Sequence, residues 1–282
     1  MKQIVVISGK GGTGKTMLTA SFAVLADNKV MADCDVDAAD LHLLLHPAIK
    51  ERHEFRSGKT AVINNDFCEE CGECIRVCRF EAVKKDFIVD SISCEGCAVC
   101  SFICPAGAIR MEENVSGEWY ISETKYGPMV HARLGIAEEN SGKLVTLVRQ
   151  NAQRIAEEES KDYVIIDGPP GIGCPVIASL ANVDLALIVT EPTLSGIHDM
   201  ERIASVAQHF KVSTKVVINK YDINLQNTDD IKKICAAKNI EVLTQLPFSQ
   251  KVIQSIVEGM PVVKYCDDRI TENIALLWEH IR

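Results

Sequence analysis

A glycine-rich loop near the beginning of the chain constrains its fold more than any other feature. Residues 9–16 fit the pattern G-x-x-x-x-G-K-[ST], which cradles phosphate groups between a strand and a helix. A continuous apolar run at residues 4–7 precedes the loop and is typical of a parallel strand buried on both faces. Helical spacing follows from residue 16 to residue 26. The order of strand, loop and helix predicts a P-loop nucleotide-binding domain.

Each residue type in this loop has a physical role in binding a nucleotide. Glycine lets the backbone curl so that its N–H groups point at phosphate oxygens, and the helix adds its positive N-terminal end. Lys15 is expected to reach the β- and γ-phosphates, and the Thr16 hydroxyl is expected to ligate Mg²⁺. The residues expected to contact ATP are Gly11, Gly12, Thr13, Gly14, Lys15 and Thr16.

Strands and helices alternate along most of the remaining chain. Besides the first strand and helix, buried strands are expected at residues 30–32, 163–167, 185–190, 215–219 and 240–246. Helices are expected at residues 41–45, 143–159, 197–210, 229–238 and 270–281. This alternation predicts an α/β fold with a mostly parallel sheet covered by helices on both faces.

The cysteines form two closely spaced runs in the first half of the chain. Eight of the twelve cysteines lie between Cys68 and Cys104, and each run has the spacing C-x2-C-x2-C-x3-C. This spacing matches the bacterial ferredoxin pattern, in which the fourth cysteine of one run ligates the cluster of the other run. Two [4Fe–4S] clusters are therefore predicted. Their ligands are Cys68, Cys71, Cys74 and Cys104 for one cluster, and Cys94, Cys97, Cys100 and Cys78 for the other. Two zinc sites are the alternative, because paired CxxC motifs also bind zinc.

The cysteine-rich segment has its own composition. Residues 64–115 carry ten acidic and five basic side chains, and the segment lacks a long helical pattern. We expect an inserted α+β ferredoxin-like domain at residues 64–117, inside a P-loop domain formed by residues 1–63 and 118–282.

Charge and hydropathy limit the partners of the chain. The formal net charge of −9 argues against nucleic acid, which needs a basic face. No apolar run approaches the roughly 20 residues that span a bilayer, and no signal peptide is recognisable. The apolar side of the last helix is expected to pack on the core rather than on a membrane. These features predict a cytoplasmic protein, in which dense cysteines indicate metal or redox chemistry rather than disulfides.

The loop has one further lysine, and the sequence K-G-G-x-G-K-T resembles the deviant Walker A motif of the MinD/ParA/nitrogenase iron protein superfamily. The resemblance implies a homodimer that sandwiches ATP, in which Lys10 reaches the nucleotide of the partner subunit. A solvated lysine without this role is the alternative.

Three other positions match functional residues of that superfamily. By resemblance, Asp35 lies in the first switch and orients the attacking water, although Asp33 or Asp37 could hold that role. Asp167 ends an apolar strand and resembles the residue that supports Mg²⁺ through water. Asn219 resembles the asparagine that recognises adenine, and a simple turn at the strand end is the alternative.

Several longer segments extend the resemblance over essentially the whole chain. Together with the P-loop and the cysteine runs, they are similar to MinD/ParA/Mrp-type ATPases of the SIMIBI class that contain an inserted ferredoxin domain. The segments are residues 127–132, 139–145 and 168–175.

Cys174 suggests a possible extra metal site. It follows Asp167 by seven positions (174 − 167 = 7), the same offset as a cluster-ligating cysteine in the nitrogenase iron protein. Two copies of Cys174 would then face each other across a dimer. The alternative is a small residue packed beside Pro175.

These features lead to one leading hypothesis of function. An ATPase and two redox centres in one chain favour a homodimeric switch in which ATP hydrolysis gates electron transfer to a redox partner. A different hypothesis is a metallocluster assembly or delivery ATPase that serves an acceptor protein. A third is a positioning ATPase that uses its clusters as a redox sensor.

Overall fold

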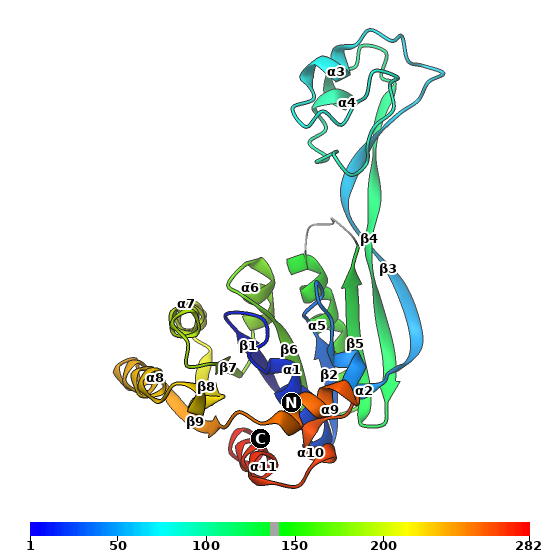
Figure 1. Ribbon diagram of the computed structural model, residues 1–282. Helices are drawn as coiled ribbons and strands as arrows, with labels where there is room; N and C mark the ends of the chain where they lie inside the picture. Colours follow the sequence, from blue (N-terminus) through cyan, green and yellow to red (C-terminus); the bar gives the residue numbers. More distant parts are fainter. Residues whose placement is uncertain (136–140) are drawn as a thin grey trace. The chain divides into compact units, whose positions relative to one another are not determined.

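The computed structural model describes residues 1–135 and 141–282, and the chain within these ranges divides into two compact units (Figure 1). The sheet unit consists of Met1–His53, Trp119–Arg133 and Ser141–Arg282. The cysteine unit consists of Glu54–Glu118, joined by Leu134 and Gly135. The segment predicted as an insert, residues 64–117, lies inside the cysteine unit. Glu139 and Asn140, which belong to one of the family-like segments, lie outside the described residues.

A parallel sheet forms the centre of the sheet unit. Its strands are β1 (Lys2–Ser8), β2 (Lys29–Asp33), β5 (Gly127–Leu134), β6 (Tyr163–Pro170), β7 (Leu185–Thr190), β8 (Ser213–Asn219) and β9 (Glu241–Leu246). Two longer strands, β3 (Ala48–Ile63) and β4 (Ile109–Thr124), contribute residues to both units. Over the described residues the sheet has nine strands in the order β3-β4-β5-β2-β6-β1-β7-β8-β9. β1 pairs in parallel with β6 and β7, so the P-loop begins at the carboxyl end of a central strand.

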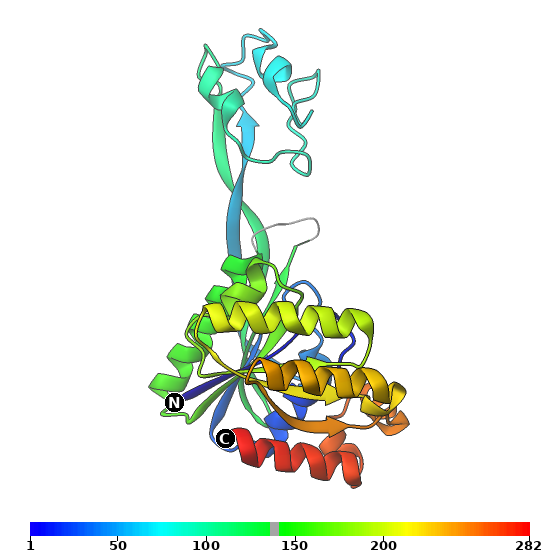
Figure 2. The ribbon, with the colours of Figure 1, turned by 90° about the vertical axis from the view of Figure 1, so that its left-hand side faces the viewer.

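Helices cover both faces of this sheet. They are α1 (Lys15–Leu25), α2 (Leu41–Leu45), α5 (Ser141–Glu158), α6 (Cys174–Leu180), α7 (Leu194–His209), α8 (Leu225–Ala237), α9 (Gln250–Val257), α10 (Val262–Tyr265) and α11 (Arg269–Ile281). α7 and α8 lie side by side (Figure 2). Alternate residues of β1 point to opposite faces, and Ile4 and Val5 are both fully buried. A strand covered on both sides explains the continuous apolar run in the sequence.

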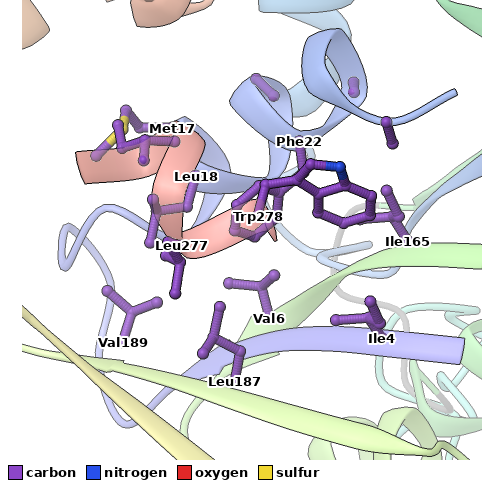
Figure 3. Close-up of a cluster of buried hydrophobic side chains, with 14 of the residues drawn as sticks. Ile4, Val6, Met17, Leu18, Phe22, Ile165, Leu187, Val189, Leu277 and Trp278 are labelled. Atoms are coloured by element: carbon purple, nitrogen blue, oxygen red, sulfur yellow. The ribbon is translucent and has the colours of Figure 1, made fainter. Parts of the chain in front are cut away.

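The main core lies between the sheet and the helices α1 and α11 (Figure 3). Trp278 of α11 packs against Phe22 of α1, with ring centroids 5.4 Å apart, and against Tyr163 at 5.3 Å. The predicted docking of the last helix on the core is therefore confirmed. No helix within the described ranges is long and apolar enough to cross a membrane.

The elements of the sequence prediction are present, with several additions. The structure adds the strands β3, β4 and β5 and the helices α6, α9 and α10. α8 begins at Leu225 rather than at residue 229, because the Asn224 side chain caps its N-terminus by accepting a hydrogen bond from the Asn227 N–H.

The cysteine unit contains two short helices and a small core. The helices α3 (Glu73–Val77) and α4 (Val99–Ile103) lie against each other. The buried core cluster that the structure describes here consists of Ala61, Cys74, Val83, Cys100 and Ile109. All twelve cysteines, which fall within the described ranges, are free of disulfides. The unit therefore has few apolar contacts and no covalent cross-link to hold it together.

Candidate nucleotide site and cysteine pockets

The P-loop adopts a conformation that only glycine accommodates without strain at two positions. Gly12 and Gly14 have φ angles of 77° and 98°, in the left-handed region. A Cβ atom at Gly14 would lie 2.4 Å from Asn219 Nδ2. Asn219 Nδ2 itself donates a hydrogen bond of 2.8 Å to the Thr13 carbonyl oxygen. Asn219 thus connects the end of β8 to the P-loop.

Lys15 is buried at the start of α1 and faces the end of β2. Its Nζ atom lies 3.5 Å from Asp35 Oδ2. Burial raises the pKa of Asp35 to about 6, and the Lys15 ammonium opposes this rise. Of the three carboxylates that the sequence offered for the first switch, Asp35 is the one paired with Lys15, whereas Asp37 is exposed.

Asp167 is fully buried and accepts two hydrogen bonds from α1. Thr16 Oγ1 donates to it over 2.7 Å and Thr19 Oγ1 over 2.9 Å. Burial raises the pKa of Asp167, and the Lys15 ammonium opposes the rise. The parallel register of β1 and β6, which sets Val6 opposite Asp167, brings this carboxylate to the P-loop. Thr16 and Asp167, which are far apart in sequence, are therefore in direct hydrogen-bond contact, and their role in holding Mg²⁺ stays a prediction.

Asp33 adds a third carboxylate at this edge of the sheet. It is completely buried, and its pKa is raised well above its ordinary value by burial and by the neighbouring Asp167. Its Oδ1 atom accepts a hydrogen bond from the Asp35 backbone N–H, whereas Oδ2 has no hydrogen-bond partner among the described residues. A cation at this site would relieve the repulsion between these buried carboxylates.

Lys10 contacts the loop after β7 of its own chain. Its Nζ atom lies 3.2 Å from Thr193 Oγ1 and 3.6 Å from Glu191 Oε2. Lys220 also pairs with Glu191, at 2.5 Å. About a third of the Lys10 side chain remains exposed, at 33%. Neither Glu191 nor Thr19 was identified from the sequence, because neither belongs to the loop motif.

Two pockets within the described part of the chain are lined by the cysteines of the two predicted sets. One pocket is lined by Cys68, Cys71, Cys74 and Cys104, with Ile63, Phe87 and Ile109 among its apolar walls. The other is lined by Cys78, Cys94, Cys97 and Cys100, with Phe80, Val83 and Val99 among its walls. The two predicted sets therefore lie in separate pockets, and their role as cluster ligands stays a prediction. In the same described ranges, no group of three or more His, Cys, Asp or Glu side chains is arranged to hold a metal ion.

The two cysteine runs share a backbone conformation. They are displaced by 26 positions (94 − 68 = 26). Left-handed residues occur at three equivalent pairs of positions, which are Glu70 and Gly96, Gly72 and Ala98, and Glu81 and Gly107. The cysteine unit is therefore built from two halves with similar backbones. Non-glycine residues such as Glu70 and Ala98 adopt the left-handed conformation only where the surrounding structure imposes it.

Backbone N–H groups surround the sulfur atom of Cys78. Burial alone would raise the pKa of this thiol, but hydrogen bonds from the backbone of Val83, Ala82, Phe80 and Glu81 lower it overall. In the equivalent position of the other half, the Ala108 N–H donates to Cys104 Sγ over 3.3 Å. Such donors stabilise a thiolate, which is the form that binds metals.

Comparison with known proteins identifies the nucleotide-binding domain. A family model described as the CobQ/CobB/MinD/ParA nucleotide binding domain matches residues 4–262. The chain belongs to this family. It is a MinD/ParA-type ATPase.

Relatives and solved structures match this MinD/ParA-type ATPase over nearly its full length. An uncharacterized protein of Methanocaldococcus jannaschii is 35% identical over 286 residues, covering 99% of this chain and 96% of that protein. The septum site-determining protein MinD of Thermotoga maritima is 25% identical, covering 99% and 87% of the two chains. The fold resembles that of MinD from Pyrococcus horikoshii, solved with Mg-ADP, with a TM-score of 0.61 at 17% identity, covering 99% of this chain and 95% of that one.

Cys174 lies at the first turn of α6 in this ATPase. It is exposed, and α6 follows β6, the strand that carries Asp167. Its proposed role as a metal ligand stays a prediction.

Gly14→Ala is expected to destabilise the nucleotide-free ATPase by about 1–3 kcal/mol, because a Cβ atom requires a strained backbone and displaces the Asn219 amide. Thermal unfolding without nucleotide measures this effect. Gly11→Ala is the matched control, since a Cβ atom there meets nothing within 4 Å and φ is not positive. Equal unfolding temperatures for the two variants would contradict the steric argument.

Proposed function

We propose that this protein is a homodimeric Mg-ATP-driven switch that couples its nucleotide cycle to electron transfer through two [4Fe–4S] clusters. The observation that carries the proposal is that the eight clustered cysteines line two pockets, four cysteines to each pocket, within one small unit. When one chain contains both an ATPase site and redox sites, the simplest explanation is that ATP hydrolysis controls electron transfer.

The nucleotide site supplies each group that ATP hydrolysis needs. Gly11, Gly12, Thr13 and Gly14 offer backbone N–H groups to the phosphates, and Lys15 neutralises their charge. Thr16 and Asp167 are the residues that would hold Mg²⁺ and its water shell. Asp35 is proposed to accept a proton from the attacking water, and its position beside Lys15 supports this role.

The dimer is part of the proposal and gives Lys10 its role. Lys10 contacts Thr193 and Glu191 at distances of a weak interaction, 3.2 Å and 3.6 Å, and its side chain is a third exposed. It can therefore leave these contacts for others at low cost. We propose that it turns to the phosphates of the partner subunit when two copies close on ATP. MinD of Aquifex aeolicus, which has a similar fold, was solved in complex with MinC, and a protein partner is proposed here as well.

Asn219 is proposed to contact adenine through the hydrogen-bonding positions of its amide that the P-loop contact does not use. Its Nδ2 atom donates to the Thr13 carbonyl, and its Oδ1 atom accepts from the Lys220 N–H. A second hydrogen on Nδ2 and a second lone pair on Oδ1 remain available for a base.

The chemistry of the cysteine pockets supports the proposed clusters. Each pocket supplies four thiols, apolar walls and backbone N–H donors near sulfur, which is the donor set of a [4Fe–4S] site. When bound, such a cluster supplies a one-electron redox centre. Free thiols in this number fit a reducing compartment, and we place the protein in the cytoplasm.

A metallocluster delivery ATPase is the second candidate function. The exposed Cys174 at the start of α6 favours it, because a carrier needs an accessible thiol near its nucleotide switch. In this case the ATP cycle would control release of a cluster to an acceptor protein.

Anaerobic purification followed by iron and sulfide analysis and EPR, with and without Mg-ATP, tests the proposal. About eight irons per chain and signals from two reduced clusters are expected. A change of the spectra or potentials on adding Mg-ATP supports gated electron transfer. Intact clusters that do not respond to ATP favour delivery, and zinc in place of iron overturns the redox proposal.

Hydrolysis is expected to depend on pH through Asp35. Its pKa of about 6 means that the carboxylate is ionised above pH 6 and protonated below it. We expect kcat/KM for Mg-ATP to be level above pH 6 and to fall about tenfold per pH unit below it, since only the ionised carboxylate can take a proton from the attacking water. ADP binding over the same range is the control. An Asp35→Asn variant that kept the same profile would assign the titration to another group.

A further inference from the structure

We infer that the exposed face of α4, together with Phe80, is the docking surface for a basic one-electron carrier protein. The surface consists of Phe80, Val99 and Phe102, and we call it the α4 surface. The inference rests on the proposed function, because it names the partner class for the redox centres.

The α4 surface is unusually apolar for residues in contact with solvent. Phe102 is 92% exposed, and Phe80 and Val99 are each 45% exposed. Val99 and Phe102 are three positions apart on α4 and therefore share one side of the helix. Single exposed apolar side chains are common, but several of them grouped on one face mark an interaction site.

This apolar character is absent from the equivalent positions of the other half. The displacement of 26 positions makes Glu73, Arg76 and Ala106 the counterparts of Val99, Phe102 and Phe80. Glu73 and Arg76 form an ion pair at 2.5 Å on the exposed face of α3. The backbone shared by the two halves therefore accommodates charged side chains at these positions. Apolar side chains at Val99 and Phe102 are not needed for α4 to fold. The difference between the halves points to a contact made by only one of them.

The α4 surface adjoins one cysteine set. Phe80 and Val99 line the pocket of Cys78, Cys94, Cys97 and Cys100. A protein seated on this surface would lie directly over that pocket, which favours a partner that exchanges electrons.

The negative charge of the cysteine unit indicates that the partner is positively charged. Residues 64–115 carry ten acidic and five basic side chains, and Glu95 belongs to the same pocket wall as Val99. An apolar surface within an acidic unit is complementary to a carrier protein whose apolar patch is surrounded by lysines. The negative charge of the unit would also attract such a carrier as it approaches.

Binding of cytochrome c, a basic haem carrier, tests this inference without measuring enzyme activity. Isothermal titration calorimetry at low ionic strength compares the wild type with Val99→Glu/Phe102→Arg, which copies the α3 pair onto α4 without changing net charge. The swap is expected to raise Kd by at least about tenfold, and added NaCl is expected to raise it for the wild type. Phe102→Ser alone is expected to act in the same direction.

The matched control is Phe67→Ser. Phe67 is 65% exposed and precedes Cys68 of the other set, and it does not line that pocket. Equal binding by the wild type and the swap, or an equal loss in Phe67→Ser, overturns the inference. It is also overturned if sedimentation shows that the swap instead abolishes a dimer.

Iron analysis of the same samples separates the two proposals. A chain with about eight irons that binds equally well after the swap refutes only the docking surface. A chain without iron that still loses binding after the swap refutes the redox function and leaves the docking surface in place.

Discussion

Replacing Lys15 with alanine is expected to abolish ATP hydrolysis and to weaken Mg-ATP binding by about 100-fold or more. The Lys15 ammonium is the buried cation of the P-loop, and charge-assisted hydrogen bonds contribute about 1.5–3 kcal/mol each, with tenfold in Kd for every 1.4 kcal/mol. The change also leaves Asp35 without its partner at 3.5 Å. Calorimetric titration with a non-hydrolysable ATP analogue and a phosphate-release assay measure the two effects.

Lys10→Ala is the matched control for this variant. Both lysines belong to the same loop, but Lys10 is partly exposed and its contacts are with Thr193 and Glu191. We expect Lys10→Ala to bind ADP as the wild type does and to lose hydrolysis that depends on dimer formation. Equal loss of ADP binding in both variants would mean that Lys10 acts within its own subunit.

Replacing the four cysteines Cys68, Cys71, Cys74 and Cys104 with serine is expected to unfold the cysteine unit and to leave the sheet unit intact. The described core cluster of the cysteine unit contains five buried residues, two of which are cysteines, and no disulfide replaces the missing contacts. A unit of this size gains at most about 3–5 kcal/mol from its apolar core, so under the proposed function its stability depends on the bound clusters. Hydrogen exchange with mass spectrometry should show fast exchange throughout Glu54–Glu118.

A variant with Cys266→Ser provides the control for this experiment. Cys266 is half-buried in the sheet unit and contacts the Val262 carbonyl oxygen. The variant is expected to keep the iron content of the wild type and the hydrogen-exchange protection of both units. Preserved protection of Glu54–Glu118 in the four-serine variant would show that the unit folds on its apolar core alone.

The sheet unit could be predicted from sequence because burial on both faces leaves a strong pattern. Strands such as β7, which matches the expected residues 185–190, are continuous apolar runs with no competing interpretation. The P-loop was also predictable, since its function depends on consecutive residues. Asp35 was found only through its resemblance to the superfamily's first switch, which left Asp33 and Asp37 as alternatives. Asp167 was also indicated by its place after four apolar residues, where an unpaired carboxylate is costly to bury.

Residues that act through tertiary contacts could not be found in this way. Thr19 contacts Asp167 only because β6 lies beside β1, and a threonine in a helix carries no signal of its own. Glu191 and Lys220 meet from separate loops. Likewise, the contact of Asn219 with the Thr13 carbonyl joins two segments more than two hundred positions apart, at |i−j| = 206.

The strand β3 was missed for a different reason. Its first residues, including Lys50, Glu51 and Glu54, are exposed and charged, and they give neither an apolar run nor a clean alternation. Backbone pairing with β4 therefore determines this strand, not the burial of its side chains.

The same charges have a consequence for how the protein behaves in a crowded solution. β3 is the terminal strand on one side of the sheet, and an uncovered strand edge is a template on which other chains can add. Lys50 pairs with Glu123 at 2.7 Å and Arg56 with Glu54 at 2.7 Å, so any chain adding to this edge would have to desolvate these groups. The charged residues that hide β3 from sequence patterns therefore make edge-to-edge addition of another chain unfavourable.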